Sequence, residues 1–237
     1  MAISGALWVA AGEKARAQQD LHRAETLKIE RKRYAGECAQ RDAEAAKSNR
    51  ELDELIASLG YGTVEAVQEY VSIVLSNSVY PEHFKVSHEF EFDPATAELR
   101  LQVLIPAPSE IPNIKSYKYT KSSDEITSTD LSQKECRERY AGAVHQVALR
   151  SLHEVFEADR RGLIHTIALE VGTKAVDPAT GQKIYISFVI AGAERSTFLA
   201  FDLSSVVPHL TLAKLGAAMS KNPYALEFAE RAGVRRS

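Results

Sequence analysis

Lysines and tyrosines alternate in one stretch of the sequence whose composition suits a phosphate backbone. Residues 111–121 read Ile-Pro-Asn-Ile-Lys-Ser-Tyr-Lys-Tyr-Thr-Lys, without an acidic residue. If this stretch is an edge strand, alternate side chains share a face. One face would then carry Lys115, Tyr117, Tyr119 and Lys121, with Lys118 on the other. Lysines that neutralise phosphates and rings that stack on bases indicate a nucleic-acid contact. Lysines also protect edge strands from aggregation, which is the alternative interpretation.

A second basic pair ends the long helix that we predict further along the chain. Arg160 and Arg161 stand directly before Gly162. Basic side chains there complement the dipole of the helix C-terminus, and glycine suits the position that follows the last turn. This structural role accounts for the pair, and DNA contact is the second interpretation. The candidate nucleic-acid-binding residues are therefore Lys115, Tyr117, Lys118, Tyr119, Lys121, Arg160 and Arg161.

Carboxylates near two predicted turns have the outline of a nuclease site. Such a site needs an Asp and a Glu-x-Lys to hold magnesium and orient a water molecule. Asp93 precedes Glu98-Leu99-Arg100, in which arginine replaces the lysine, and Asp177 with Lys183 gives a second, poorer outline. An Asp before Pro is first of all a turn residue. We therefore expect no catalytic residues, and a divergent metal-dependent nuclease using Asp93 and Glu98 remains the alternative.

Motifs for other chemistry are absent from the sequence. The chain has no G-x-S-x-G elbow, no P-loop and no dinucleotide-binding glycine motif. Its histidines are scattered, and His145 and His153 stand eight apart, too far along a helix to share a metal as an i, i+4 pair does. We expect no metal site and no cofactor. Arg150 lies beside the apolar stripe of a predicted helix, where an arginine usually holds a carboxylate or a carbonyl.

Composition limits the class of protein. The 237 residues carry a formal net charge of -3, which excludes a globally basic nucleic-acid coat. Cys38 and Cys136 are the only cysteines, so neither a disulfide framework nor a four-cysteine zinc site can form, and we expect a cytoplasmic protein. No apolar run reaches about 18 residues, so no membrane span is expected. The short apolar start, without a preceding basic residue, does not read as a signal peptide.

Residues 1–59 are expected to form a helical arm or coiled coil. The stretch 13–57 contains one glycine, no proline and many strong helix formers. A thin heptad seam runs through Tyr34, Cys38, Ala45, Leu52, Leu55 and Leu59, and Arg31, Arg41 and Ser48 interrupt it. A lone helix of this length needs a partner surface. We expect a homo-oligomer through this helix, and packing against the chain's own second domain is the alternative.

Residues 60–237 are expected to form an α+β domain. Thr63 is a good N-cap for a second helix, and Ser132 with Glu135 has capping-box spacing at the start of a long one. Period-two patterns predict hairpins before and after that helix, so we expect an antiparallel sheet packed on it. The remaining predictions are a strand over 197–203, a short helix over 208–219 and a C-terminal helix over 224–231. Asp-Pro-Ala-Thr occurs at 93 and again at 177, which related hairpins or turn chemistry alone would explain.

Several ordered motifs resemble one known group of proteins. They include Ser78-Val79-Tyr80-Pro81-Glu82-His83-Phe84, Lys115-Ser116-Tyr117-Lys118-Tyr119-Thr120-Lys121 and Gln146-Val147-Ala148-Leu149-Arg150-Ser151-Leu152-His153-Glu154-Val155-Phe156. Asp177-Pro178-Ala179-Thr180-Gly181 follows them in the same order. Residues 64–224 thereby resemble the domain upstream of the nuclease domain in bacterial Mrr-like restriction endonucleases. The sequence ends at Ser237, where that nuclease domain would begin, so the family's catalytic Asp, Glu and Lys have no counterparts here.

The resemblance implies a context and not an activity. We expect a non-catalytic assembly and recognition module of a bacterial restriction or anti-phage defence system, with DNA as a possible ligand. A nuclease or another defence protein is a further candidate partner, and no membrane contact is expected. A protein-binding adaptor without DNA contact is the alternative to DNA recognition.

Overall fold

The computed structural model describes residues 3–177 and 179–230, with side chains from Arg16 onward. The chain divides into two units, Met1–Gly60 and Tyr61–Ser237. The first unit is formed by helix α1, Ile3–Tyr61, which confirms the predicted helix within the described residues. From Arg16 to Arg50 every side chain except that of Cys38 is exposed. Gly62 then takes a φ of +66°, a left-handed conformation that glycine adopts without strain.

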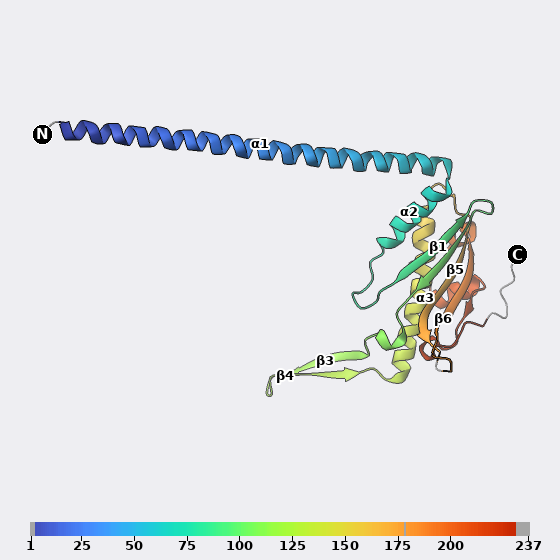
Figure 1. The fold of residues 1–237 in the computed structure, drawn as a ribbon. Coiled ribbons are helices and arrows are strands. Elements are labelled where there is room, and N and C mark those ends of the chain that lie inside the picture. The colour runs from blue at the N-terminus through green and yellow to red at the C-terminus, as the bar shows by residue number, and fades with distance from the viewer. Residues whose placement is uncertain (1–2, 178, 231–237) are drawn as a thin grey trace. The chain divides into compact units, whose positions relative to one another are not determined.

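The second unit is built on a sheet that we call the main sheet (Figure 1). Within the described residues its strand order is β1-β2-β5-β6-β7. The strands are β1 (Ser87–Asp93), β2 (Glu98–Leu104), β5 (Thr166–Val176), β6 (Lys183–Glu194) and β7 (Ala218–Met219). The hairpins β1–β2 and β5–β6 are antiparallel, as the period-two patterns predict. The α+β class is therefore confirmed.

One pairing makes the main sheet mixed rather than purely antiparallel. Strand β2 pairs with β5 in parallel, from Glu98 opposite Thr166 to Leu104 opposite Gly172. A parallel pair needs a long crossover, and helix α3 (Gln133–Ala158) provides it. The crossover also contains a short 3-10 turn, Pro108–Glu110, and a separate hairpin of β3 (Ile114–Thr120) and β4 (Glu125–Asp130). Hydrophobic patterning locates strands but does not show which strand pairs with which.

Helices cover one face of the main sheet. Helix α2 (Val64–Ser76) begins at Thr63, whose side chain accepts from the Ala66 N–H, and it packs on β1 and α3. Helix α3 begins with the predicted capping box of Ser132 and Glu135. Its buried face includes Tyr140, Val144, Leu152 and Phe156, and it faces β5 and β6. This layer of helix on sheet is the core of the second unit.

The segment after β6 differs from the sequence predictions. The strand predicted over 197–203 is wrong, because α4 (Arg195–Leu199) is helical there and carries Phe198 onto Phe156, with ring centroids 5.4 Å apart. Helix α5 (Pro208–Lys214) is shorter than predicted and is followed by β7. A 3-10 turn, Pro223–Ala225, replaces the predicted C-terminal helix as far as residue 230, and Arg231 lies outside the described residues.

In the part of the chain that the structure describes, none of the helices combines the length and apolar character that a membrane crossing requires. Helix α1 is long enough, but charged residues recur in it from Glu13 to Glu54.

Candidate functional site

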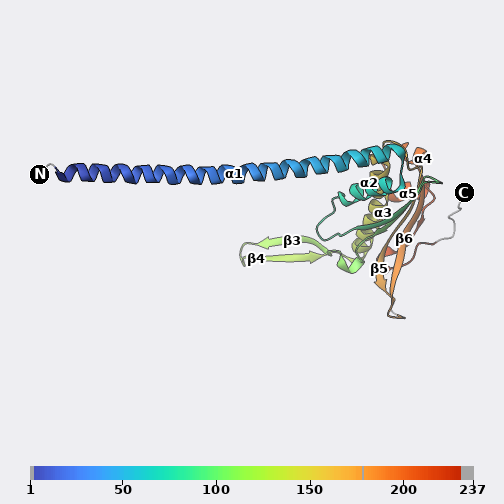
Figure 2. The same cartoon turned by 45° about the horizontal axis from the view of Figure 1, so that its top comes forward.

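The β3–β4 hairpin carries most of the candidate residues and has no core of its own. Figures 1 and 2 show its two strands as a ladder separate from the main sheet. Tyr117 lies opposite Ser128, and Tyr119 lies opposite Ile126. Tyr117, Tyr119 and Ile126 therefore share one face, and their side chains are 68%, 58% and 70% exposed. We call these three residues the hairpin patch.

The lysines are distributed differently from the sequence interpretation. Lys118 lies opposite Thr127 on the face away from the hairpin patch, as predicted. Lys121 falls in the turn beyond the strand. Lys115 sits where the pairing register shifts between Ile114 and Ser116, so the strict alternation that put it on one face with the tyrosines does not hold.

Lys115 is engaged in holding the base of the hairpin. Its Nζ lies 2.5 Å from Oε1 of Glu135, in the capping box of α3. The Lys115 ammonium, followed by the Ser132 hydroxyl and backbone N–H, lowers the pKa of Glu135 to about 2. The Leu131 N–H donates to the Asn113 carbonyl beside this contact, at 2.7 Å. The structure therefore gives Lys115 a positioning role at the junction of hairpin and helix.

Charges on the hairpin cancel. Strand β3 and the turn carry Lys115, Lys118 and Lys121, whereas the turn and β4 carry Asp124, Glu125 and Asp130. The Tyr119 hydroxyl donates to Oδ1 of Asp124 at 2.7 Å, which raises the pKa of Tyr119. The acid-free stretch thus acquires acidic neighbours from a strand that the sequence interpretation did not include.

Arg160 and Arg161 lie far from the hairpin. Both are exposed directly after the C-terminal end of α3, whereas the hairpin joins its N-terminal end. The 26 residues of α3 span about 39 Å at about 1.5 Å per residue. Gly162 has a φ of +69°, as its predicted place after the helix requires. The structure does not bring the two sets of candidate residues together.

Asp159 fixes the chain between this helix end and the main sheet. Its carboxylate accepts from the backbone N–H groups of Leu163 and Ile164 at 3.1 and 2.8 Å. Arg195 Nη1 donates to the same carboxylate at 2.9 Å, and Asp159 is 7% exposed. A buried carboxylate paired in this way has a structural role.

At the first candidate nuclease site, the Asp93 carboxylate accepts hydrogen bonds from its own turn. The Asp93 carboxylate accepts from the Ala95 N–H and the Thr96 hydroxyl, both at 2.9 Å, and these bonds lower its pKa. Arg100 Nε lies 3.2 Å from Glu98 Oε1, so this arginine pairs with the other carboxylate of the outline. The second outline uses the same bonds, from the Ala179 N–H and the Thr180 hydroxyl to Asp177, again at 2.9 Å.

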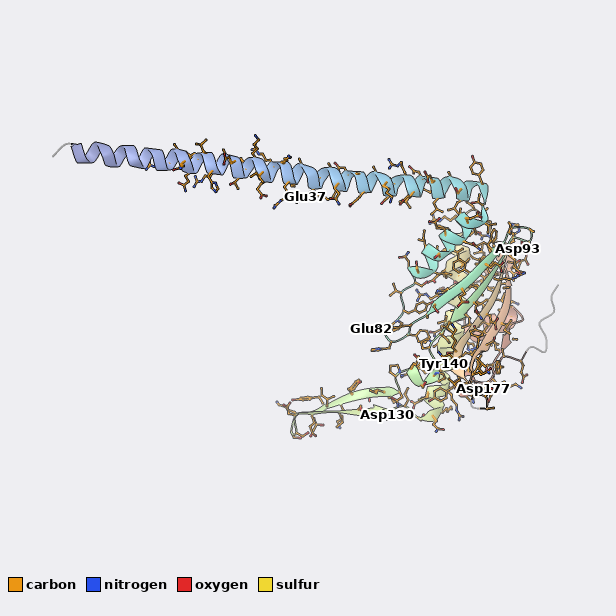
Figure 3. The ribbon with its side chains drawn as sticks, in the orientation of Figure 1. Glu37, Glu82, Asp93, Asp130, Tyr140 and Asp177 are labelled. Carbon is orange, nitrogen blue, oxygen red and sulfur yellow. The ribbon has the colours of Figure 1, made fainter. Side chains whose placement is uncertain are left out.

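The two outlines also lie at opposite ends of the main sheet. Asp93 ends β1 beside Glu98, next to the first residues of β5, whereas Asp177 follows the last residue of β5. Figure 3 shows both side chains at these separate turns. Turn chemistry explains the repeated Asp-Pro-Ala-Thr, since both copies cap their turns with identical hydrogen bonds.

A polar cluster connects the loop after α2 to helix α3. Only one of its members, Arg150, is identified from the sequence. Arg150 Nε lies 2.6 Å from Glu154 Oε1, and its Nη1 donates to the Val79 carbonyl at 2.8 Å. Arg150 therefore holds both a carboxylate and a carbonyl, as predicted. Its guanidinium also lies 4.6 Å from the ring centroid of Tyr80, and Ser78 donates to Glu154.

Three polar atoms around this cluster are buried without a hydrogen-bond partner among the described residues. They are the Tyr80 hydroxyl, Nε2 of His88 and the Ser151 hydroxyl. Burial raises the pKa of Tyr80 and lowers the pKa of His88, so both side chains are neutral at pH 7. The residues come from a loop, a strand and a helix, and no local motif in the sequence predicts their meeting.

The second unit has two further polar features, a groove and a histidine pair. An open groove of about 700 Å³ lies between the loop after α2, the end of β2 and β5, and its charged lining residues are Glu82, Lys85, Glu110 and Lys174. The rings of His145 and His209 lie 6.2 Å apart, and burial lowers the pKa of His145. Among the described residues no three His, Cys, Asp or Glu side chains are grouped as a metal site requires.

Comparison with protein-family models, with curated proteins and with solved structures found no match for this chain.

Proposed function

We propose that this chain is an assembly and recognition module of a bacterial restriction or anti-phage defence system, acting in the cytoplasm. The motif resemblance supplies the context, and a chain whose two cysteines form no disulfide with each other suits that compartment. The observation that carries the proposal is the hairpin patch, three large side chains exposed on a two-stranded ladder. A two-stranded hairpin without a core is marginally stable in water, so a partner surface would stabilise it.

DNA is the first candidate for the recognised partner. Tyr117 and Tyr119 offer free aromatic faces, whereas Lys118 offers a cation on the opposite face of the hairpin and Lys121 offers one in its turn. Rings and lysines together suit single-stranded or unpaired bases best, because only unpaired bases present a face for stacking. Arg160 and Arg161 would be a separate contact, about the length of α3 away.

A salt-dependent binding measurement tests the DNA contact. In this proposal Lys118→Ala with Lys121→Ala reduces the salt slope by about 0.7 to 0.9 for each lysine that contacts a phosphate. Tyr117→Ala weakens binding to single strands more than to duplex. Lys115 is left intact, because its loss would disturb the capping box of α3. The matched control is Lys183→Ala with Lys214→Ala, which removes the same charge from exposed positions on β6 and α5.

A protein partner is the second candidate, and the charge balance of the hairpin favours it. Three acids offset the three lysines, whereas DNA-binding surfaces carry a net positive charge. If the double-lysine variant keeps its DNA affinity and its salt slope, the hairpin patch is assigned to protein binding, and the adaptor function is favoured.

The module is proposed to be non-catalytic, and the turn geometry at Asp93 supports this. Its carboxylate is bound within its own turn, and Arg100 stands where the outline needs a lysine. We expect no DNA cleavage with magnesium or manganese. Cleavage that disappears in Asp93→Ala would establish the nuclease alternative.

A further inference from the structure

We propose that α1 pairs with α1 of a second copy in an antiparallel coiled coil, with Arg23 placed opposite Glu44 of the partner subunit. This inference rests on the assembly role proposed above and adds the partner's orientation and register. It starts from an apolar seam that is exposed in the first unit. Leu27, Tyr34 and Leu52 on that seam are 53%, 64% and 54% exposed.

Heptad positions organise this seam. With Cys38 at an a position and Tyr34 at a d position, the apolar a and d residues from Arg16 onward are Ala17, Ala24, Leu27, Tyr34, Cys38, Ala45, Leu52, Leu55 and Leu59. The residues at e and g flank the seam and face the partner's flanking residues in either orientation. Their charges therefore distinguish a parallel pair from an antiparallel one.

The flanking charges change sign along the helix. The g positions are basic in the N-terminal part, at Arg16 and Arg23. They are acidic further along, at Glu30, Glu37, Glu44 and Glu51. The e positions show the same trend, with Lys28 before Asp42. A helix with this charge gradient complements a copy of itself that runs in the opposite direction.

Parallel pairing in register places like charges together. In that arrangement each g residue faces the e residue five positions later on the partner. Arg23 would face Lys28 of the partner subunit, and Glu37 would face Asp42 of the partner subunit. No g-to-e pair of opposite sign forms along the described side chains to offset this repulsion.

Antiparallel pairing brings opposite charges together instead, because g then faces g and e faces e. In the register we propose, Arg16 faces Glu51 of the partner subunit, and Lys28 faces Asp42 of the partner subunit. The twofold symmetry makes each pair twice. One like-charge contact remains, between Glu30 and Glu37 of the partner subunit. Arg33 offsets it, since this arginine lies 2.8 Å from Glu30 and 3.5 Å from Glu37 on its own helix.

One of the residues that interrupt the seam, Arg31, also finds a partner in this register. The layers are set by Cys38, which falls in the same layer as Leu27 of the partner subunit. Arg31 falls opposite Tyr34 of the partner subunit, where a guanidinium can lie on the tyrosine ring. Arg31 at an a position therefore has a partner that a parallel pair, with arginine against arginine, would not give it.

Disulfide trapping in the full chain tests the orientation, with Cys136→Ser removing the other cysteine. The antiparallel register separates the two copies of Cys38 by about 16 Å along the axis, eleven residues at about 1.5 Å each. Cys38 alone should therefore give no covalent dimer on oxidation. Adding Leu27→Cys should give one efficiently, whereas Leu27→Cys combined with Cys38→Ser should not. A Cys38-to-Cys38 dimer would overturn the antiparallel arrangement.

A charge reversal provides an independent readout without cysteines. Arg23→Glu replaces two attractive pairs with repulsive ones, and we expect about fivefold weaker dimerisation. Arg23→Glu combined with Glu44→Arg should restore the wild-type affinity. In a parallel dimer the single change would instead strengthen association, because the introduced carboxylate would then face Lys28 of the partner subunit. Helix content measured by circular dichroism must stay constant for all variants.

A measurement of the molar mass distinguishes a failure of this inference from a failure of the assembly role on which it rests. Light scattering that gives a monomer at all concentrations would contradict both the assembly role and the antiparallel pair. A dimer that traps only Cys38 with Cys38, or that traps no cysteine pair, would contradict the orientation and register alone. A dimer that traps Cys38 only with Leu27→Cys supports both.

Discussion

Helices α1 and α3 have similar composition but opposite surroundings. Both are rich in Ala, Glu and Arg, and both are long helices. Helix α3 buries residues such as Tyr140 and Leu152 against the main sheet, whereas α1 has an exposed surface within its own unit. Helix propensity favours both helices, but only α3 is also stabilised by packing within its own unit.

The two kinds of hairpin repeat this contrast. Strands β5 and β6 form a long ladder whose inner side chains are buried, including Leu169 and Val189. Strands β3 and β4 form a ladder of similar regularity without a buried side chain. Backbone hydrogen bonding therefore does not distinguish the hairpin of the core from the hairpin that we propose as a binding surface. The elements that lack a core are the ones we assign to partners.

The largest expected effect follows from truncating matched leucines on the two helices. Leu152 is 0% exposed on α3, whereas Leu27 is 53% exposed on α1. Leu152→Ala should lower the free energy of unfolding of the second unit by about 3 kcal/mol, because it removes buried methyl groups and leaves a cavity. Leu27→Ala should change it by less than about 0.5 kcal/mol while weakening dimerisation.

Urea unfolding followed by near-ultraviolet circular dichroism would measure both leucine variants, and sedimentation would measure their assembly. An equal loss of stability in the two variants would show that α1 is packed in the monomer and would end the contrast between the helices.

Two glycines of the main sheet give the next largest difference. A Cβ on Gly172 would lie 2.2 Å from the Ile186 carbonyl oxygen and 2.7 Å from Cζ of Tyr185. Gly172→Ala should therefore cost about 2 kcal/mol or more of stability through overpacking. Gly192, on the adjoining strand, has no atom within 4 Å of such a Cβ, and Gly192→Ala should stay within about 0.5 kcal/mol of the wild type. Thermal unfolding of the pair measures this, and equal melting temperatures would contradict the close contact.

Local signals in the sequence predicted local structure well. The Thr63 cap, the capping box at Ser132 and Glu135, and the period-two strands all lie where the patterns placed them. Each of these depends on residues within a few positions of one another, and so it can be read without knowing the fold.

Contacts between distant segments could not be predicted in the same way. The parallel pairing of β2 with β5 depends on how the crossover packs. Strand β4 was missed because its Thr- and Ser-rich sequence has no apolar alternation, and this omission hid the acids beside the lysines. The separation of Arg160 from the hairpin likewise follows from the length of α3, which the charge pattern alone does not reveal.

The smallest expected effect concerns the junction where the coreless hairpin meets the packed helix. The Lys115 ammonium and the Ser132 groups lower the pKa of Glu135 from 4.5 to about 2. A carboxylate with a lowered pKa contributes stability that is present above its unfolded value and is lost as pH falls through its folded value. The junction should therefore stay intact at pH 5 and weaken progressively between about pH 4.5 and pH 2. Because Glu135 is exposed to solvent, we expect local detachment rather than unfolding of the second unit.

An NMR titration of the Glu135 side-chain carboxyl would measure this junction directly. In Lys115→Ala the pKa of Glu135 should rise toward 4.5 without reaching it, since the Ser132 hydroxyl and N–H still donate to the carboxylate. Lys118→Ala is the matched control, because Lys118 occupies the same strand beyond the register shift at Lys115 and lies opposite Thr127. It should leave the Glu135 titration unchanged. If Lys115→Ala also leaves the titration unchanged, Lys115 does not anchor the hairpin, and its ammonium becomes available to the DNA contact.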